Sequence, residues 1–141
     1  MRIGELAKQA GTDAQTVRYY EREGILAAPS RTASGYRAYG PAHVERLNFI
    51  RHCRSLDMPL ADVKRLLELS GDRGVSCEDV NTLVQSHLER VRAKRAALEA
   101  LEKQLSALHA HCESGHRIAD CGILEELIHA AQGEACACHP R

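Results

Sequence analysis

Apolar residues recur at helical spacing at the start of the chain and predict two short helices separated by a turn. The apolar face of the first helix consists of Ile3, Leu6, Ala7 and Ala10. Gly11 predicts the end of that helix, and the run from Thr12 to Gln15 has the form of a capping box that begins the next one. The second helix is expected to bury Val17 and Tyr20 and to end at Gly24. Its outward side carries Gln15, Arg18, Tyr19 and Arg22.

A different pattern follows at residues 30–39. Ser34-Gly35 is a turn signal, and the residues from Tyr36 to Tyr39 alternate with period two, which predicts a short two-stranded hairpin, called the wing below. Gly40-Pro41 then opens a third helix, and a fourth runs from Pro59 to Ser70. The third helix has apolar positions at helical spacing: Val44, Leu47, Ile50 and Cys53.

The longest periodic run starts at the capping signal Ser76-Cys77 and predicts a helix over residues 76–112. Alternating steps of three and four from Cys77 reach Val80, Val84, His87, Val91, Lys94, Leu98, Leu101, Leu105, Leu108 and Cys112. Most of these positions are Val or Leu, which is typical of a coiled-coil seam with a period of 3.5 residues. A helix of this length has nothing of its own to cover the seam, so we expect dimerisation through it. The alternative is that the helix packs on its own domain.

The periodicity breaks after Cys112. Asp120 is expected to cap a last short helix, which Gly133 ends, and its apolar residues are Ile123, Leu124, Leu127 and Ile128. The predicted fold class is mainly α, with a winged helix-turn-helix domain at residues 1–70 and a dimerisation helix at 76–112. A metal-binding loop and short helix (113–132) and a flexible Cys/His tail (133–141) complete it.

Charge and composition narrow the functional classes. Residues 1–56 hold nine Lys or Arg against five Asp or Glu, a net of +4, and residues 57–141 hold ten against fourteen, a net of −4. A basic front half suggests that only this half meets a polyanion. No stretch is long and apolar enough to span a membrane, and the first residues do not form a signal peptide, so we expect a cytoplasmic protein. In that reducing compartment, six cysteines favour metal binding or redox chemistry over disulfides.

The first half has the features that reading double-stranded DNA requires. A helix fits the major groove, and an outward arginine such as Arg18 can donate two hydrogen bonds to a guanine. Arg31 and Arg37 of the wing would meet phosphates, with the hydroxyls of Tyr36 and Tyr39 beside them.

Several motifs in this order resemble the MerR family of transcription regulators over roughly residues 1–132. They are Ile3-Gly4-Glu5-Leu6-Ala7, Thr16-Val17-Arg18-Tyr19-Tyr20-Glu21, Gly24-Ile25-Leu26, Gly35-Tyr36-Arg37-Ala38-Tyr39, Phe49-Ile50-Arg51-His52-Cys53-Arg54 and Leu56-Asp57-Met58-Pro59-Leu60. The resemblance implies a winged helix-turn-helix domain, a long antiparallel dimerisation helix and a C-terminal effector loop. It implies that the homodimer binds an operator in an over-long promoter spacer and, with effector bound, distorts the DNA so that RNA polymerase is activated indirectly. Carried over by position, the DNA contacts are Arg18, Tyr19, Arg31, Tyr36, Arg37, Tyr39 and Arg54.

Three cysteines are the candidate metal ligands. Cys77 and Cys112 lie at opposite ends of the seam, about 52 Å apart along a helix, so one chain cannot use both for one ion. An antiparallel dimer would place Cys77 beside Cys112 of the partner subunit, and the following loop would add Cys121 as a third thiolate. Cys53 is in phase with the core of the third helix and is interpreted as structural.

Three thiolates select a soft or borderline divalent ion. Copper-type monovalent sensors of the family carry Ser at the position of Cys77, and residues 43–60 and 121–124 most resemble the lead- and cadmium-responsive branch. Pb²⁺ or Cd²⁺ therefore ranks first. Zn²⁺ ranks second, because Cys112, His116 and Cys121 match the spacing of the zinc branch, although His111 stands where that branch has another cysteine. Hg²⁺ ranks third, because the mercury branch shares the cysteine spacing.

The tail pattern Cys136, Cys138 and His139, together with His116, is a possible accessory metal site, and a solvated tail is the alternative. Two other functional classes compete with the metal-responsive regulator. The first is a redox regulator on the same fold, whose cysteines hold an iron–sulfur cluster or a disulfide. It would be expected to have four clustered cysteines in the effector loop, which here has two. An enzyme is not expected, because no nucleophile–base pair, phosphate loop or paired carboxylates stand out.

Overall fold

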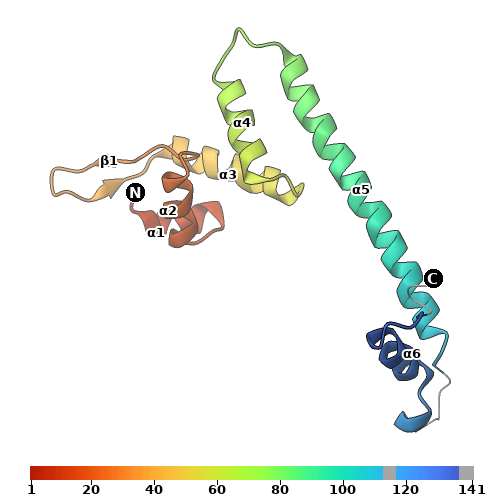
Figure 1. The fold of residues 1–141 in the computed structure, drawn as a ribbon. Helices are drawn as coiled ribbons and strands as arrows, with labels where there is room; N and C mark the ends of the chain where they lie inside the picture. Colours follow the sequence, from red (N-terminus) through yellow and green to blue (C-terminus); the bar gives the residue numbers. More distant parts are fainter. Residues whose placement is uncertain (113–116, 137–141) are drawn as a thin grey trace. The chain divides into compact units, whose positions relative to one another are not determined.

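The computed structural model describes residues 1–112 and 117–136 of the chain (Figure 1). Its elements form two compact units, Met1–Val84 and Gln85–Arg141. The order of elements is α1 (Ile3–Ala10), α2 (Ala14–Arg22), β1 (Ser30–Arg31), β2 (Arg37–Ala38), α3 (Pro41–Ser55), α4 (Leu60–Ser70), α5 (Cys77–His109), the 3₁₀ helix η1 (Ile118–Asp120) and α6 (Gly122–Ala131). The mainly helical fold class is therefore confirmed. Among the described residues, no helix is both long and apolar enough to cross a membrane.

The turn between α1 and α2 differs by one residue from its prediction. Gly11 adopts a left-handed conformation with φ 68°, and the N–H of Thr12 donates to the carbonyl of Ala7 at 2.9 Å, which closes α1. Because Thr12 belongs to the end of α1, the cap of α2 is Asp13, whose carboxylate accepts from the N–H of Thr16 at 2.7 Å. The prediction that Thr12 caps this helix was wrong.

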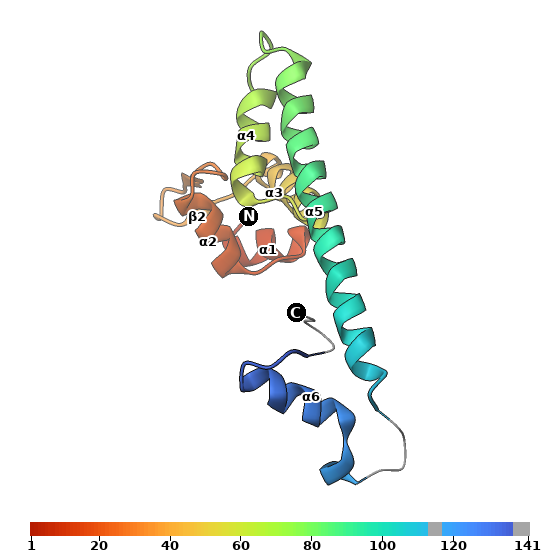
Figure 2. The ribbon, with the colours of Figure 1, turned by 45° about the vertical axis from the view of Figure 1, so that its right-hand side comes forward.

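The wing is the predicted hairpin, with strands of two residues each. β1 and β2 are antiparallel, and Ser30 lies opposite Ala38. The N–H of Thr32 donates to the carbonyl of Tyr36, and Gly35 supplies the positive φ of 84° that the turn requires. The wing extends from the bundle of α1, α2 and α3 in both ribbon views (Figures 1 and 2).

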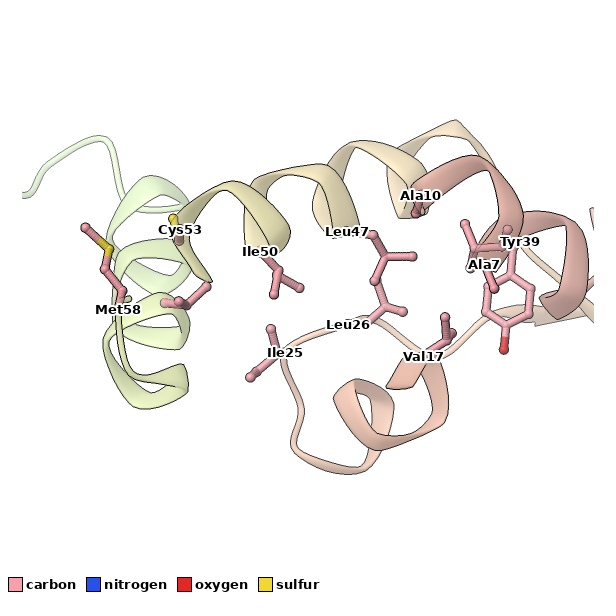
Figure 3. Close-up of a cluster of buried hydrophobic side chains, with 12 residues drawn as sticks. Ala7, Ala10, Val17, Ile25, Leu26, Tyr39, Leu47, Ile50, Cys53 and Met58 are labelled. Carbon is pink, nitrogen blue, oxygen red and sulfur yellow. The ribbon is translucent and has the colours of Figure 1, made fainter. Parts of the chain in front are cut away.

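The core of the first unit lies where α1 packs on α2 and α3 and where α3 packs on α4. Figure 3 shows its side chains pointing toward one another from these elements and from the segment after α2. Leu6, Val17, Ile50 and Val63 are fully buried. Burying each such side chain stabilises the fold by roughly 1.5–3 kcal/mol. Because Val17 belongs to this cluster, the cluster fixes the position of α2, whose other face is exposed. The apolar spacing of the sequence predicted Leu6, Val17 and Ile50 as core residues.

Helix α5 is one continuous helix from Cys77 to His109 (Figure 1). It ends three residues before the predicted boundary, because the N–H groups of His111 and Cys112 donate to carbonyls three residues earlier, at 3.1 and 3.0 Å, and tighten the last turn. Cys112 therefore lies just beyond the helix. Within a single chain, large apolar seam residues stay exposed: Val84, Val91, Leu98, Leu101 and Leu105.

The C-terminal elements also differ slightly from their prediction. The residue that caps α6 is Cys121, whereas Asp120, the predicted cap, is the last residue of η1. Gly133 follows the end of α6 with a φ of 86°, as expected for a residue that terminates a helix. This arrangement places the thiol of Cys121 directly at the start of α6.

Candidate nucleic-acid interface and metal centre

The exposed face of α2 is rich in donors. Arg18, Arg22 and Gln15 are exposed, and the Tyr19 side chain is 43% exposed. Among the described residues, the Arg18 guanidinium makes no hydrogen bond or ion pair, so its donors are available to a ligand. The start of α2 is fixed, because the N–H of Thr16 donates a hydrogen bond to the Asp13 carboxylate. The same hydrogen bond lowers the pKa of Asp13 below its ordinary value of 3.8.

Two of the predicted wing contacts are exposed and held in place. The Arg31 guanidinium donates to the carbonyl of Gly35 at 3.0 Å and fastens the turn. The Tyr36 ring is 55% exposed, and the guanidinium of Arg2 lies 4.4 Å from its centroid. This cation–π contact presents a second cation beside the tyrosine hydroxyl. Sequence reasoning missed Arg2, because nothing in the linear pattern places it against Tyr36.

Tyr39 is not an exposed contact. The residue is 3% exposed, its hydroxyl donates to the Glu21 carboxylate, and its backbone exchanges two hydrogen bonds with Met1. Burial, followed by the hydrogen bond to Glu21, raises the pKa of Tyr39. In this structure Tyr39 is therefore a core residue whose hydroxyl faces α2, and its predicted contact with DNA stays a prediction. The Arg37 side chain is exposed, and its Nη1 forms an ion pair with Oε2 of Glu21 at 3.1 Å.

Arg54 lies on α3 near the helix-turn-helix turn. Its Nη1 donates to the carbonyl of Met58 at 2.7 Å, which orients the guanidinium. A small hollow of about 140 Å³ adjoins it, lined by Ala10, Gly11, Thr12, Tyr20, Leu47, Arg51 and Arg54. Arg51 brings a second guanidinium to this hollow. It was missed, although its spacing of three residues from Arg54 places both on one helix face.

Two of the candidate metal ligands, Cys112 and Cys121, stand next to a close approach of the backbone in the second unit. A Cβ added to Gly122 would lie 2.3 Å from the carbonyl oxygen of His111, so the two backbones are in direct contact and only glycine fits. The His111 Nδ1 and the Glu126 carboxylate, 3.8 Å apart, join the same segments. The neighbours of these two contacting residues are Cys112 and Cys121. These two cysteines thus stand next to one close approach of the backbone.

The remaining cysteines are distributed as follows. Cys77 is exposed at the first position of α5, and Cys112 is also exposed. Cys53 is buried, and burial raises the pKa of its thiol, which agrees with the structural role expected for it. Cys136 is buried. The other possible accessory ligands, His116, Cys138 and His139, lie outside the described residues.

Among the described residues of one chain, no three His, Cys, Asp or Glu side chains gather at a point where they could hold an ion. The described part of one chain therefore supplies no third ligand beside Cys112 and Cys121. Helix α5 spans about 50 Å, so Cys77 at its start is too far along the helix to serve the loop at its end.

Comparison with known proteins decides the family. Residues 1–70 match the MerR HTH family regulatory protein model, and residues 44–108 match the model described as MerR, DNA binding. The chain is 36% identical to the HTH-type transcriptional regulator HmrR of Sinorhizobium medicae, covering 100% of this chain and 95% of the relative. It is 37% identical to the HTH-type transcriptional regulator ZntR of Escherichia coli K12, covering 97% and 99%. The chain belongs to the MerR family.

The chain is also similar to a solved structure of a transcription regulator. It is the transcription regulator PbrR691 from Ralstonia metallidurans CH34 in complex with lead(II), which is 45% identical. The match covers 90% of this chain and 98% of that chain, with a TM-score of 0.81. The MerR membership confirms the predicted winged helix-turn-helix and assigns the chain to DNA-binding transcription regulators, not enzymes.

Proposed function

We propose that this chain is a homodimeric regulator that binds promoter DNA and activates transcription when a soft divalent metal ion binds its cysteines. The observation that carries the proposal is the contact of Gly122 with His111, the residues next to Cys121 and Cys112 in the chain, close to the end of a helix whose apolar seam residues are exposed. Two thiols beside an unpartnered seam suit an ion that is shared between two subunits.

The first unit supplies the DNA-binding surface. Arg18 and Tyr19 on α2 face outward and would read base edges in the major groove. Three further residues would contact the phosphate backbone: Arg31, Tyr36 and Arg37. Arg54, oriented by the carbonyl of Met58, would contact a phosphate on the other side of α2.

A second copy of this chain is the proposed cover for the seam of α5. Leu98 is 65% exposed and Leu105 is 56% exposed in one chain, and large apolar side chains at heptad spacing lose this exposure in a coiled coil. In an antiparallel pair, Cys77 of each subunit would approach the loop that holds Cys112 and Cys121 of the partner subunit. Two equivalent three-thiolate sites would result.

The donor set fits a thiophilic divalent cation. Cys77 and Cys112 are exposed free thiols, and Cys121 is a half-buried free thiol at a helix start. The bound ion would supply bonds from one subunit's loop to the other subunit's helix. The loop and the start of α5 would then be held together, which favours one dimer geometry over another and so changes the shape of the bound DNA. The effect on RNA polymerase is indirect, and the regulator acts in the cytoplasm with its DNA.

Pb²⁺ or Cd²⁺ is the proposed effector. The 45% identity to the regulator solved with lead(II) supports this choice. Zn²⁺ is the alternative, supported by the 37% identity to ZntR. However, His111 occupies the position where the zinc branch has a second cysteine, and its ring lies near Glu126. Hg²⁺ ranks third.

A parallel titration of the metal-free protein tests the proposal. Pb²⁺, Cd²⁺, Zn²⁺ and Hg²⁺ are each added to the protein on operator DNA, and transcription from the promoter is measured in vitro. Pb²⁺ or Cd²⁺ should activate at the lowest free concentration, with one ion bound per subunit. Activation by none of the four ions, with operator binding intact, would contradict the metal-responsive function. Activation by Zn²⁺ at lower free concentration than Pb²⁺ and Cd²⁺ would select the alternative.

A further inference from the structure

One carboxylate connects the recognition helix to the wing. On α2, Oε2 of Glu21 accepts a hydrogen bond from Nη1 of Arg37 at 3.1 Å, and Oε1 accepts one from the hydroxyl of Tyr39. The Glu21 side chain is only 12% exposed, whereas that of Arg37 is 42% exposed. Each oxygen of this carboxylate therefore binds a different residue of one wing segment.

The tyrosine gives this connection a fixed end. The Tyr39 ring packs edge-on against His43, with centroids 5.2 Å apart and planes at 83°, and the residue is buried. Its backbone N–H donates to the carbonyl of Met1 at 2.8 Å. A rigid hydroxyl fixes the carboxylate, and the second carboxylate oxygen then restricts the guanidinium of Arg37. Hydrogen bonds between charged groups are strong and directional, so they suit such an orienting role.

We propose that Glu21 is a positioning residue for operator binding, which fixes the wing against α2 and orients Arg37 toward the DNA backbone. The inference rests on the proposed contact between Arg37 and phosphate. Glu21 itself would not touch DNA. Charge alone predicts the opposite effect of its removal, because an acidic group near phosphates opposes DNA binding. The sign of the change therefore separates positioning from simple electrostatics.

Two substitutions isolate the positioning role. Glu21→Gln removes the charge and keeps an acceptor for Tyr39, whereas Glu21→Asp keeps the charge on a side chain one methylene shorter. Operator affinity is measured by fluorescence anisotropy at several salt concentrations, after thermal melting has confirmed the fold. Both variants should bind operator about tenfold more weakly. The slope of log affinity against log salt concentration is negative, and its magnitude should decrease by about 0.9, which corresponds to the loss of one phosphate contact. If Glu21→Gln melts below the assay temperature, Glu21→Asp alone decides.

Glu23→Gln is the matched control, because it makes the same charge change two residues later at an exposed position. It should leave operator affinity unchanged or slightly tighter. Unchanged or tighter binding by both Glu21 variants would overturn the inference.

Arg37→Ala separates this inference from the proposed function. If Arg37 contacts phosphate through the orientation that Glu21 gives it, then Arg37→Ala should weaken binding, and adding Glu21→Gln to it should weaken binding no further. A full additional loss in the double variant would overturn the positioning role alone. Wild-type affinity and salt slope in Arg37→Ala would instead contradict the proposed DNA contact of the wing.

Discussion

Gly122→Ala tests the backbone contact that lies beside Cys112 and Cys121, the two candidate metal ligands of the second unit. The added Cβ would lie 2.3 Å from the carbonyl oxygen of His111 and 3.3 Å from its carbonyl carbon. Non-bonded heavy atoms settle at roughly 3.5 Å, so one of the two backbones must move by about 1 Å. Metal sites tolerate deviations of only about 0.2 Å in ligand distance. The substitution should therefore separate Cys112 from Cys121 by more than a metal site accepts.

The magnitude follows from the cost of overpacking. Forcing a methyl group into a filled position costs about 1–3 kcal/mol. If this cost falls on the metal-bound form, metal affinity should drop by roughly 5- to 150-fold. Operator binding without metal should stay at the wild-type level, because α1 to α4 lie in the other compact unit.

The assay is a Pb²⁺ titration against a competing chelator, followed by thiolate-to-metal charge-transfer absorbance. Gly133→Ala is the control, since its φ of 86° strains a side chain while nothing lies within 4 Å of the added Cβ. It should lower thermal stability and leave Pb²⁺ affinity unchanged. Wild-type affinity in Gly122→Ala, or an equal loss in Gly133→Ala, would refute the role of this contact.

Three further predictions concern DNA binding and the dimer. Arg18→Ala should reduce discrimination between operator and random DNA by about 1–3 kcal/mol in competition binding, whereas Arg65→Ala on α4 should not; unchanged discrimination would refute the placement of the recognition helix. Asp13→Ala should lower the melting temperature and weaken operator binding, because the N–H of Thr16 loses its acceptor. The pKa of Asp13 is lowered in the fold, so its contribution to stability should be present above pH 3.8 and disappear as pH falls through the lower folded value, which melting curves against pH check. Leu101→Lys should give monomers in sedimentation analysis, and a stable dimer would contradict the seam.

The helices of the first unit could be predicted because their apolar period is set by the core they bury. Val17 and Ile50 are fully buried, as the spacing indicated. The cap of α2 could not be placed to one residue, because Thr12 and Asp13 are both good caps in isolation. The choice between them depends on the end of the previous helix, which takes the N–H of Thr12.

The exposure of individual wing residues could also not be predicted from the sequence. Period-two alternation gives opposite faces for neighbouring residues and does not say which face the rest of the domain covers. Tyr36 and Tyr39 looked equivalent as hydroxyl donors, yet one is 55% exposed and the other 3%. Tyr39 belongs to the buried hydrophobic core, and Glu21, which is distant in sequence, binds its hydroxyl together with Arg37.

The sequence proposed candidate metal ligands, but it did not indicate the backbone contact that lies beside two of them. The cysteines were prominent in composition and position, but the contact between Gly122 and His111 depends on the path of the loop between α5 and α6. Heptad spacing extended to Cys112, whereas the helix ends at His109, because a periodic pattern does not record where the last turn tightens.

Mixed dimers of cysteine variants test the central claim, that each metal site draws thiolates from both subunits. One chain carries Cys77→Ser, and the other carries Cys112→Ser with Cys121→Ser. Neither homodimer can assemble three thiolates, but a mixed dimer can assemble one complete site. Isolated mixed dimers should bind about one Pb²⁺ at near wild-type affinity, because soft ions are held by thiolate count. Both parent homodimers should bind far more weakly while still binding operator DNA. A folded mixed dimer that binds Pb²⁺ as weakly as its parents would contradict the shared site and the antiparallel seam.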